Sequence, residues 1–362
     1  MMNKTVCMVA GEASADRHAA AVIRALKETV PGVEVFGIGG PEMRSAGMEC
    51  LYGIEEFSVM GFSDVLPRIN RIFSVYNGLL RAIKERKPGL VMPVDLPDFN
   101  MRLAKAAKRT GAKVLYYIAP QAWAWRRYRA RSLAKITDGL AVIFPFEEEF
   151  FSSYGVNARY VGHPFMEHPS EKGGQAAWPP RNIVLMPGSR KHEVRTILPV
   201  MCEAKAAVQK RHPEVQWHLQ VAPGIDQEDI RSMTGGDIRL SAEPPAADLA
   251  MVKSGTSSFE MAVLGIPEVI CYRTSNLNYR LAKAFVKVDS IGMPNIILGR
   301  PAVPELIQDA FTGEALAAEI LTLIDDEHRY REMTSAFEEM RARLGTSRPS
   351  RGVAAWIQSL ID

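Results

Sequence analysis

Two turns in the second half of the chain consist of the residue types that bind phosphate. An apolar strand ends in Pro187-Gly188-Ser189-Arg190, and Ser254-Gly255-Thr256 opens a predicted helix that contains Glu260. Glycine and serine let backbone N–H groups approach an anion, and a helix N-terminus adds positive partial charge. Arg190 can hold a phosphate by two hydrogen bonds, and Glu260 can accept from ribose hydroxyls. These turns predict a nucleotide diphosphate site. The sequence has no Walker lysine motif and no Gly-x-Gly-x-x-Gly, which disfavours ATPase and dinucleotide-binding functions.

The first half of the chain offers candidates for a general base. Asp95 ends an apolar strand within Val94-Asp95-Leu96-Pro97-Asp98-Phe99-Asn100, a loop that holds two carboxylates and an amide. A carboxylate at the carboxyl end of a parallel strand can take a proton from a sugar hydroxyl. Glu12, which lies with Ser14 in the loop after the first strand, is the competing base. For Asp98 the favoured interpretation is a helix N-cap.

A third loop and a helix make part of the first half basic and apolar. Trp125 and Arg126 belong to Pro120-Gln121-Ala122-Trp123-Ala124-Trp125-Arg126, where strand-like alternation would put both tryptophans on one face. The apolar segment 57–62 precedes an amphipathic helix predicted over 66–86, of a kind that ordinarily covers a sheet. Its arginines and apolar residues would also suit an anionic membrane surface or an acyl-chain groove. The apolar residues concerned are Val59, Met60, Phe62, Ile69, Ile72 and Phe73.

Two further residues have a structural and a functional interpretation. Asn295 in Met293-Pro294-Asn295-Ile296-Ile297 fits a turn as well as a site near the nucleotide, and 304–308 fits a turn or a helix start. His163 in Gly162-His163-Pro164 closes the first domain and is either an interdomain hinge contact in the cleft or a structural histidine.

Strand and helix signals alternate along the chain and predict the α/β class. Short apolar strands separated by helices indicate parallel sheets covered on both faces. The 362 residues exceed what one core usually serves, and a polar segment over 168–180 reads as a linker. We therefore predict two Rossmann-like domains, 1–167 and 181–335, followed by a helical tail over 336–362.

Composition excludes several classes of protein. A hydrophobic content of 47% with 23% charged residues is typical of a soluble globular protein. The net charge of +3 is too small to indicate a nucleic-acid partner. The four cysteines lack metal-ligand spacing, so we expect free thiols and no metal site. Neither a signal peptide nor an apolar stretch of about 20 residues is present, which predicts a cytoplasmic protein, soluble or peripheral.

Together the motifs resemble one family. The chain contains Gly-Glu-Ala-Ser-x-Asp, Val-Asp-x-Pro-Asp-Phe-Asn, Pro-x-x-Trp-Ala-Trp-Arg, Pro-Gly-Ser-Arg, Ser-Gly-Thr-x-x-x-Glu and Pro-Asn-Ile-Ile, in the order found in lipid-A-disaccharide synthases. The resemblance implies a GT-B glycosyltransferase. Such an enzyme would join UDP-2,3-diacylglucosamine to 2,3-diacylglucosamine 1-phosphate (lipid X) with inversion and without a metal, forming the β-1,6 disaccharide and UDP.

The resemblance also implies roles for single residues. Asp95 would be the base on the acceptor 6-hydroxyl, Arg190 a diphosphate ligand, and Asn295 a neighbour of the nucleotide. Members of the family associate peripherally with the inner membrane through the first domain, and their C-terminal helices cross back to it. Some members exchange this region between protomers, so monomer and homodimer remain alternatives. The chain departs from the family at Ala15, where glycine is usual, and at Ser257-Ser258-Phe259.

Two other functions remain open at this point. A UDP-N-acetylglucosamine 2-epimerase would share the two-domain architecture but has no need of a basic, apolar surface. A non-catalytic protein that binds nucleotide sugars or lipids could use the same scaffold.

Overall fold

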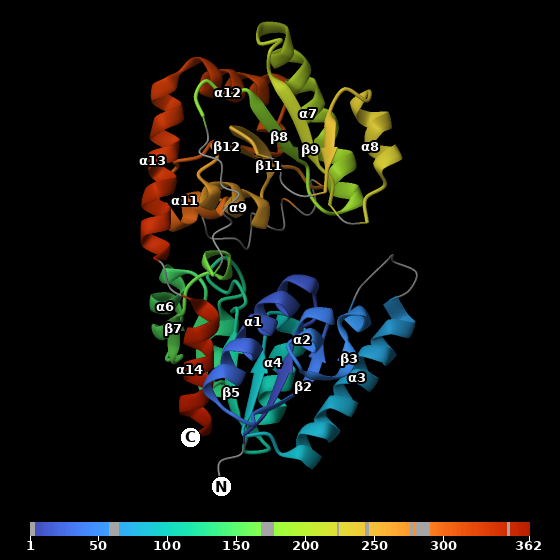
Figure 1. Cartoon of the computed structure of the whole chain (residues 1–362), viewed down its shortest axis with the longest axis vertical. Helices are drawn as coiled ribbons and strands as arrows, with labels where there is room; N and C mark the ends of the chain where they lie inside the picture. The colour runs from blue at the N-terminus through green and yellow to red at the C-terminus, as the bar shows by residue number, and fades with distance from the viewer. Residues whose placement is uncertain are drawn as a thin grey trace. The chain divides into compact units, whose positions relative to one another are not determined.

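The chain forms two compact units in a computed structural model, and each is described by itself. The structure describes residues 4–57, 65–167, 177–222, 224–242, 246–275, 279, 290–345 and 348–362, with the backbone alone for 65–69. One unit comprises Met1–Glu167 and Leu344–Asp362, and the other comprises His168–Arg343. Both are α/β with parallel sheets, as the alternating strand and helix signals predict (Figure 1).

The first unit contains a seven-stranded sheet in the order β3-β2-β1-β4-β5-β6-β7. Its strands are β1 (Thr5–Val9), β2 (Glu34–Gly39), β3 (Glu49–Gly53), β4 (Leu90–Pro93), β5 (Lys113–Tyr117), β6 (Gly139–Val142) and β7 (Ala158–Tyr160). Every neighbouring pair is parallel. The strand order reverses between β1 and β4, so the loops that follow these two strands meet at one edge. Such a switch point is where open parallel sheets bind ligands.

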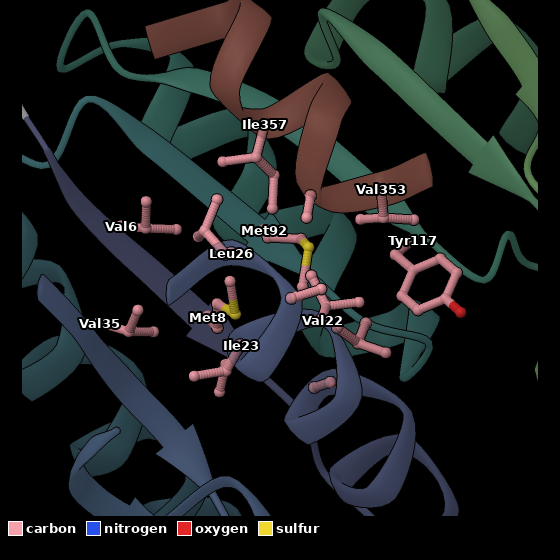
Figure 2. Close-up of a cluster of buried hydrophobic side chains, with 14 of the residues drawn as sticks. Val6, Met8, Val22, Ile23, Leu26, Val35, Met92, Tyr117, Val353 and Ile357 are labelled. Atoms are coloured by element: carbon pink, nitrogen blue, oxygen red, sulfur yellow. The ribbon is translucent and has the colours of Figure 1, made fainter. Parts of the chain in front are cut away.

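Helices cover both faces of this sheet. They are α1 (Ala13–Thr29), α2 (Pro41–Ser45), α3 (Val65–Arg86), α4 (Pro97–Lys108), α5 (Tyr128–Ile136), α6 (Pro145–Ser152) and α14 (Pro349–Ile361), with 3-10 turns η1 (Ile54–Phe57) and η3 (Pro164–Met166). One face packs against α1 and α14, where Val353 and Ile357 of the C-terminal helix lie over Leu26 and Met92 (Figure 2). The other face packs against α3, α4 and α5.

The second unit contains a six-stranded parallel sheet in the order β10-β9-β8-β11-β12-β13. Its strands are β8 (Asn182–Met186), β9 (Gln216–Gln220), β10 (Arg239–Ser241), β11 (Leu249–Lys253), β12 (Glu268–Tyr272) and β13 (Glu305–Ile307). The helices are α7 (Lys191–Arg211), α8 (Gln227–Thr234), α9 (Thr256–Leu264), α11 (Met293–Leu298), α12 (Gly313–Asp325) and α13 (Glu327–Leu344), with the 3-10 turn η4 (Gln308–Ala310). Here the strand order reverses between β8 and β11, which brings the two phosphate-type turns to one edge.

Three local expectations differ from the structure. Within segment 304–308, residues Glu305–Ile307 form the edge strand β13 where a turn or helix start was expected, because parallel pairing with β12 satisfies their backbone, and Gln308 begins η4. The tryptophans near residue 124 lie in a turn, with Trp123 buried and Trp125 exposed, so strand alternation is wrong there. The compact units divide at Leu344, later than the expected boundary at 336, since α13 is one continuous helix.

Candidate active site

The backbone at Asp95 is held in a conformation that non-glycine residues seldom adopt. Asp95 and Leu96 have φ angles of 49° and 48°, so the chain makes a left-handed turn directly after β4. The Asp95 N–H donates to Tyr117 O at 3.0 Å, and the Asp95 carbonyl accepts from Tyr116 Oη and Asn100 Nδ2, both at 2.7 Å. Such conformations cost about 1–3 kcal/mol each and persist where surrounding contacts enforce them. Buried partners thus fix the position of the Asp95 carboxylate.

Glu12 meets Asp95 across the switch point of the first sheet. The two carboxyl groups are within hydrogen-bonding reach, and burial followed by the Glu12 charge raises the pKa of Asp95 to about 6. Ser14 Oγ donates to Glu12 Oε1 at 2.8 Å. A Cβ on Gly11 would lie 2.5 Å from Leu96 Cδ2, so a glycine is what lets these two loops approach. A half-buried carboxyl with a pKa of about 6 next to a second carboxyl suits proton transfer at neutral pH.

Asp16, which belongs to the first motif of the chain, has a structural role. Asp16 is buried and accepts from the backbone N–H groups of Gly40, Glu42 and Met43 at 2.7–3.1 Å. Its carboxylate therefore caps α2 and ties the first loop to the sheet edge. Because α1 begins at Ala13, its N-terminus also lies beside the carboxyl pair.

Asp98 is not the N-cap of α4. The helix begins at Pro97, and Leu96 occupies the N-cap position, because proline is favoured as the first helical residue. The Asp98 carboxylate is exposed and pairs with Arg129, with Arg126 at 3.9 Å. Arg126 in turn stacks over Trp125, 4.2 Å from the guanidinium carbon to the ring centroid. This group presents cations and an exposed indole beside the Asp95 loop.

Two candidate residues of the first unit are buried within it. Asn100 donates through Nδ2 to Val94 O and Asp95 O, which makes it a support of the Asp95 backbone. His163 lies against the rings of Phe144 and Phe165, and its Nδ1 accepts from the Phe165 N–H. Burial, and then the charge of a neighbouring histidine, lowers the pKa of His163 to about 3. The structural interpretation of His163 is the one its surroundings favour.

The first phosphate-type turn of the second unit is built around Glu193. Gly188 has φ 116°, and a Cβ there would lie 2.7 Å from Glu193 Oε2. Arg190 is the N-cap of α7, and its exposed guanidinium lies 3.2 Å from Glu193 Oε1. Ser189 is exposed beside it. The turn therefore presents an arginine and the N-terminus of α7 at the end of β8.

The structure adds Lys253, which the sequence analysis missed. Lys253 ends β11, and its Nζ lies 3.2 Å from the same Glu193 Oε1 that Arg190 contacts. Two cations thus share one carboxylate between the two turns. A lysine directly before Ser254 was visible in the sequence, but only the pairing of β8 with β11 brings it to Arg190.

The second turn leads into α9 and is tied to β13. Gly255 is the N-cap and Thr256 the first helical residue, and both are exposed. Ser254 Oγ donates to Ile291 O at 3.1 Å, and Glu305 accepts from the N–H groups of Ile291 and Gly292. The open end of α9 leaves backbone N–H groups available to an anion.

Asn295 and Glu260 are the two remaining candidates for the nucleotide site. Asn295 donates to Val303 O and Glu305 Oε1 and accepts from the N–H groups of Ala302 and Val303, which uses its full capacity. Its contribution is to brace the segment that holds Ser254. Glu260 is half-buried one turn into α9, so its role toward ribose stays a prediction.

The residues expected at a membrane fall mostly outside the described side chains. Val59, Met60 and Phe62 lie outside the described residues, and so does the side chain of Ile69. Ile72 is half-buried and Phe73 is 51% exposed. Within the described part of the chain, every helix is too short or too polar to cross a bilayer. The same residues contain no group of three His, Cys, Asp or Glu side chains that could hold a metal ion.

Comparison with solved structures defines the class of protein. The UDP-N-acetylglucosamine 2-epimerase of Neisseria meningitidis, bound to UDP-GlcNAc, superimposes with a TM-score of 0.67 at 12% identity, over 98% of this chain and 100% of the other. The calicheamicin glycosyltransferase CalG4 superimposes with a TM-score of 0.62 at 13% identity, over 99% and 98%. At such identities the likeness shows the fold alone, which is that of GT-B glycosyltransferases and these epimerases.

Sequence comparison then decides between a glycosyltransferase and an epimerase. The family model of lipid-A-disaccharide synthetase matches residues 6–354. A lipid-A-disaccharide synthase of Anaeromyxobacter dehalogenans strain 2CP-1 is 41% identical over 356 residues, covering 94% of this chain and 93% of that protein. The chain belongs to the lipid-A-disaccharide synthase family and is a glycosyltransferase. The resemblance drawn from the motifs is confirmed, and the epimerase alternative is not favoured.

Proposed function

We propose that this chain transfers 2,3-diacylglucosamine from its UDP conjugate to the 6-hydroxyl of 2,3-diacylglucosamine 1-phosphate, with Asp95 as the base. The observation that carries this assignment is the half-buried Asp95 carboxyl, which lies beside Glu12 on a backbone held by its own hydrogen bonds. A single base is what an inverting transfer to a hydroxyl requires.

The proposed reaction is one displacement. The acceptor oxygen attacks the anomeric carbon as its proton passes to the Asp95 carboxylate, and the bond from that carbon to the UDP oxygen breaks. Burial and then the interaction with Glu12 raise the pKa of Asp95, which makes the aspartate a stronger base. Since the proton moves in the transition state, the base must be ionised before attack, and activity falls below pH about 6.

The second unit supplies the charges for the leaving group. UDP develops negative charge as the bond breaks, and fixed cations and helix N-termini stabilise that charge without reorganising. We assign Arg190 and Lys253 to the diphosphate, together with the N–H groups of Gly188, Ser189 and Gly255. Ser254, Thr256 and Glu260 complete the proposed nucleotide site, with Asn295 as a brace. These donors make metal independence an expectation for the chain.

Peripheral contact with the anionic, cytoplasmic face of the inner membrane is part of the proposal. Its support is the exposed Phe73 on α3 and the arginines on the same helix. Burying aromatic surface and placing basic residues near anionic lipids both favour such binding. A homodimer, with the C-terminal helices exchanged or not, remains an alternative to a monomer.

The decisive experiment is incubation of the chain with UDP-diacylglucosamine and diacylglucosamine 1-phosphate, followed by mass spectrometry. We expect the disaccharide 1-phosphate and UDP, in equal yield with and without EDTA. UDP-sugar isomerisation without a disaccharide would contradict the assignment. Loss of the product in EDTA alone would contradict only the metal independence.

A further inference from the structure

A cavity of about 730 Å³ opens in the first unit beside the proposed base. It lies between α3 and α4 and reaches Leu96, the residue that follows Asp95. Its lining consists of Phe57, Ile72, Phe73, Tyr76, Leu96, Asp98, Phe99, Arg102, Lys105, Ala106 and Arg109. A hollow of this size is in the range of small-molecule sites, and its position ties it to the acceptor side of the reaction.

The walls of the cavity are apolar and aromatic. Phe57 and Tyr76 both pack edge-on against Phe99, with ring centroids 5.0 and 5.6 Å apart. These three rings form part of the cavity wall, and Phe73, which is 51% exposed, lines the cavity with them. An exposed aromatic surface of this kind favours an apolar ligand, since covering it removes apolar area from water.

One edge of the cavity carries a row of cations. Arg102, Lys105 and Arg109 follow Asp98 at helical spacing along one side of α4, over roughly 16 Å at 1.5 Å per residue. All three are exposed, and no carboxylate of the described residues pairs with them. Asp98, by contrast, is neutralised by Arg129. The row is therefore positive, and complementary to an anionic group at the mouth of the cavity.

We propose that this cavity binds an acyl chain of the acceptor, with the acceptor phosphate on Arg102 and its neighbouring cations. The proposal rests on the proposed function, because it takes the acceptor to be an acylated sugar phosphate. The sugar then lies over Leu96 with its hydroxyl at Asp95, and the chain runs along α4 between aromatic walls. The site selects acceptors by acyl length and by phosphate.

The first test fills the cavity. Ala106 lines it, so Ala106→Phe excludes part of the chain, and Ala318→Phe on the exposed side of α12 is the matched control. Each excluded methylene loses about fourfold in binding, so kcat/KM for a long-chain acceptor falls about tenfold or more. For a short-chain acceptor the value stays near that of the parent. An equal loss with both acceptors, or no loss with either, would overturn the proposal.

The second test measures how Arg102 contributes to recognition of the acceptor phosphate. Arg102→Gln removes a charge-assisted hydrogen bond, and we expect KM for the phosphorylated acceptor to rise about tenfold or more with kcat retained. The dephosphorylated acceptor should show no difference between variant and parent. Arg24→Gln, on the exposed side of α1, is the control and should match the parent with both acceptors. A KM that rises equally for both acceptors would remove Arg102 from phosphate recognition.

Two readouts keep this proposal separate from its alternatives. Titration calorimetry with the acylated sugar phosphate alone measures binding to the cavity in the absence of transfer. An affinity that depends on acyl length would therefore support the proposal even if no disaccharide forms. Sedimentation with anionic vesicles tests the membrane as the occupant. If Ala106→Phe and Arg102→Gln release the chain from vesicles but leave acceptor selectivity unchanged, the cavity is a membrane contact and the proposal fails.

Discussion

Replacing Asp95 by asparagine should inactivate the enzyme and stabilise its first unit. The amide cannot accept the acceptor's proton, so transfer should fall by at least about a hundredfold, the lower range for loss of a general base. The same change removes a half-buried negative charge next to Glu12. Because the Asp95 side chain is similar in size to asparagine, the left-handed turn and its buried partners should remain in place.

The size of the stabilisation follows from the pKa of Asp95. A value of about 6, against an ordinary 3.8, means that ionising this carboxyl costs the folded state up to about 3 kcal/mol. The folded state binds the proton of Asp95 more tightly than the unfolded state does. The stabilising contribution of this carboxyl is therefore fully present below the unfolded pKa and is lost as pH rises through 6. Asp95→Asn should therefore gain up to about 3 kcal/mol near pH 8 and almost nothing near pH 4.

The assay compares variant and parent at the same pH. Hydrogen exchange of the β1 and β4 amides reports the opening free energy of the first unit, and UDP binding by calorimetry checks that the second unit is unaffected. Glu149→Gln is the matched control: a carboxylate-to-amide change in the same unit, at an exposed side chain on α6. Its stability should shift by less than about 1 kcal/mol at either pH. If Asp95→Asn retains turnover, or is no more stable than the parent near pH 8, the assignment of a buried base is wrong.

Three further predictions concern the charges and turns around the two sites. Glu12→Gln should lower the pKa seen in the pH–rate profile from about 6, though not to 3.8, because burial is the larger cause; an unchanged profile would contradict the pairing of the two carboxyls. Lys253→Met should weaken UDP binding by about tenfold or more and reduce its salt dependence. Lys210→Met, at an exposed lysine in the last turn of α7, should change it little. Gly188→Ala should also weaken UDP binding, since a Cβ would meet a carboxylate oxygen at 2.7 Å. Gly224→Ala has a similar positive φ with open space around it, and equal UDP affinity in these two variants would refute the steric argument.

Local patterns predicted the elements well, because short apolar strands separated by helices require parallel sheets buried on both faces. They also located both turns and the Asp95 loop. Local patterns were weaker where a choice depended on neighbours far away in sequence. Asp98 fitted an N-cap until Pro97 proved to be the first helical residue. Segment 304–308 fitted a turn or a helix start, but pairing with β12 makes Glu305–Ile307 a strand.

The sequence by itself determined the α/β class, the family and the loops that carry the chemistry, since these follow from residue type and order. Tertiary structure decided which of those residues meet. The reversal of strand order between β1 and β4 puts Glu12 against Asp95, and the reversal between β8 and β11 puts Lys253 beside Arg190. Motif residues such as Asp16 and Asn295 are structural supports, because their hydrogen bonds are made to backbone groups of neighbouring segments. A pKa depends on burial and nearby charge, which exist only after the sheet has assembled.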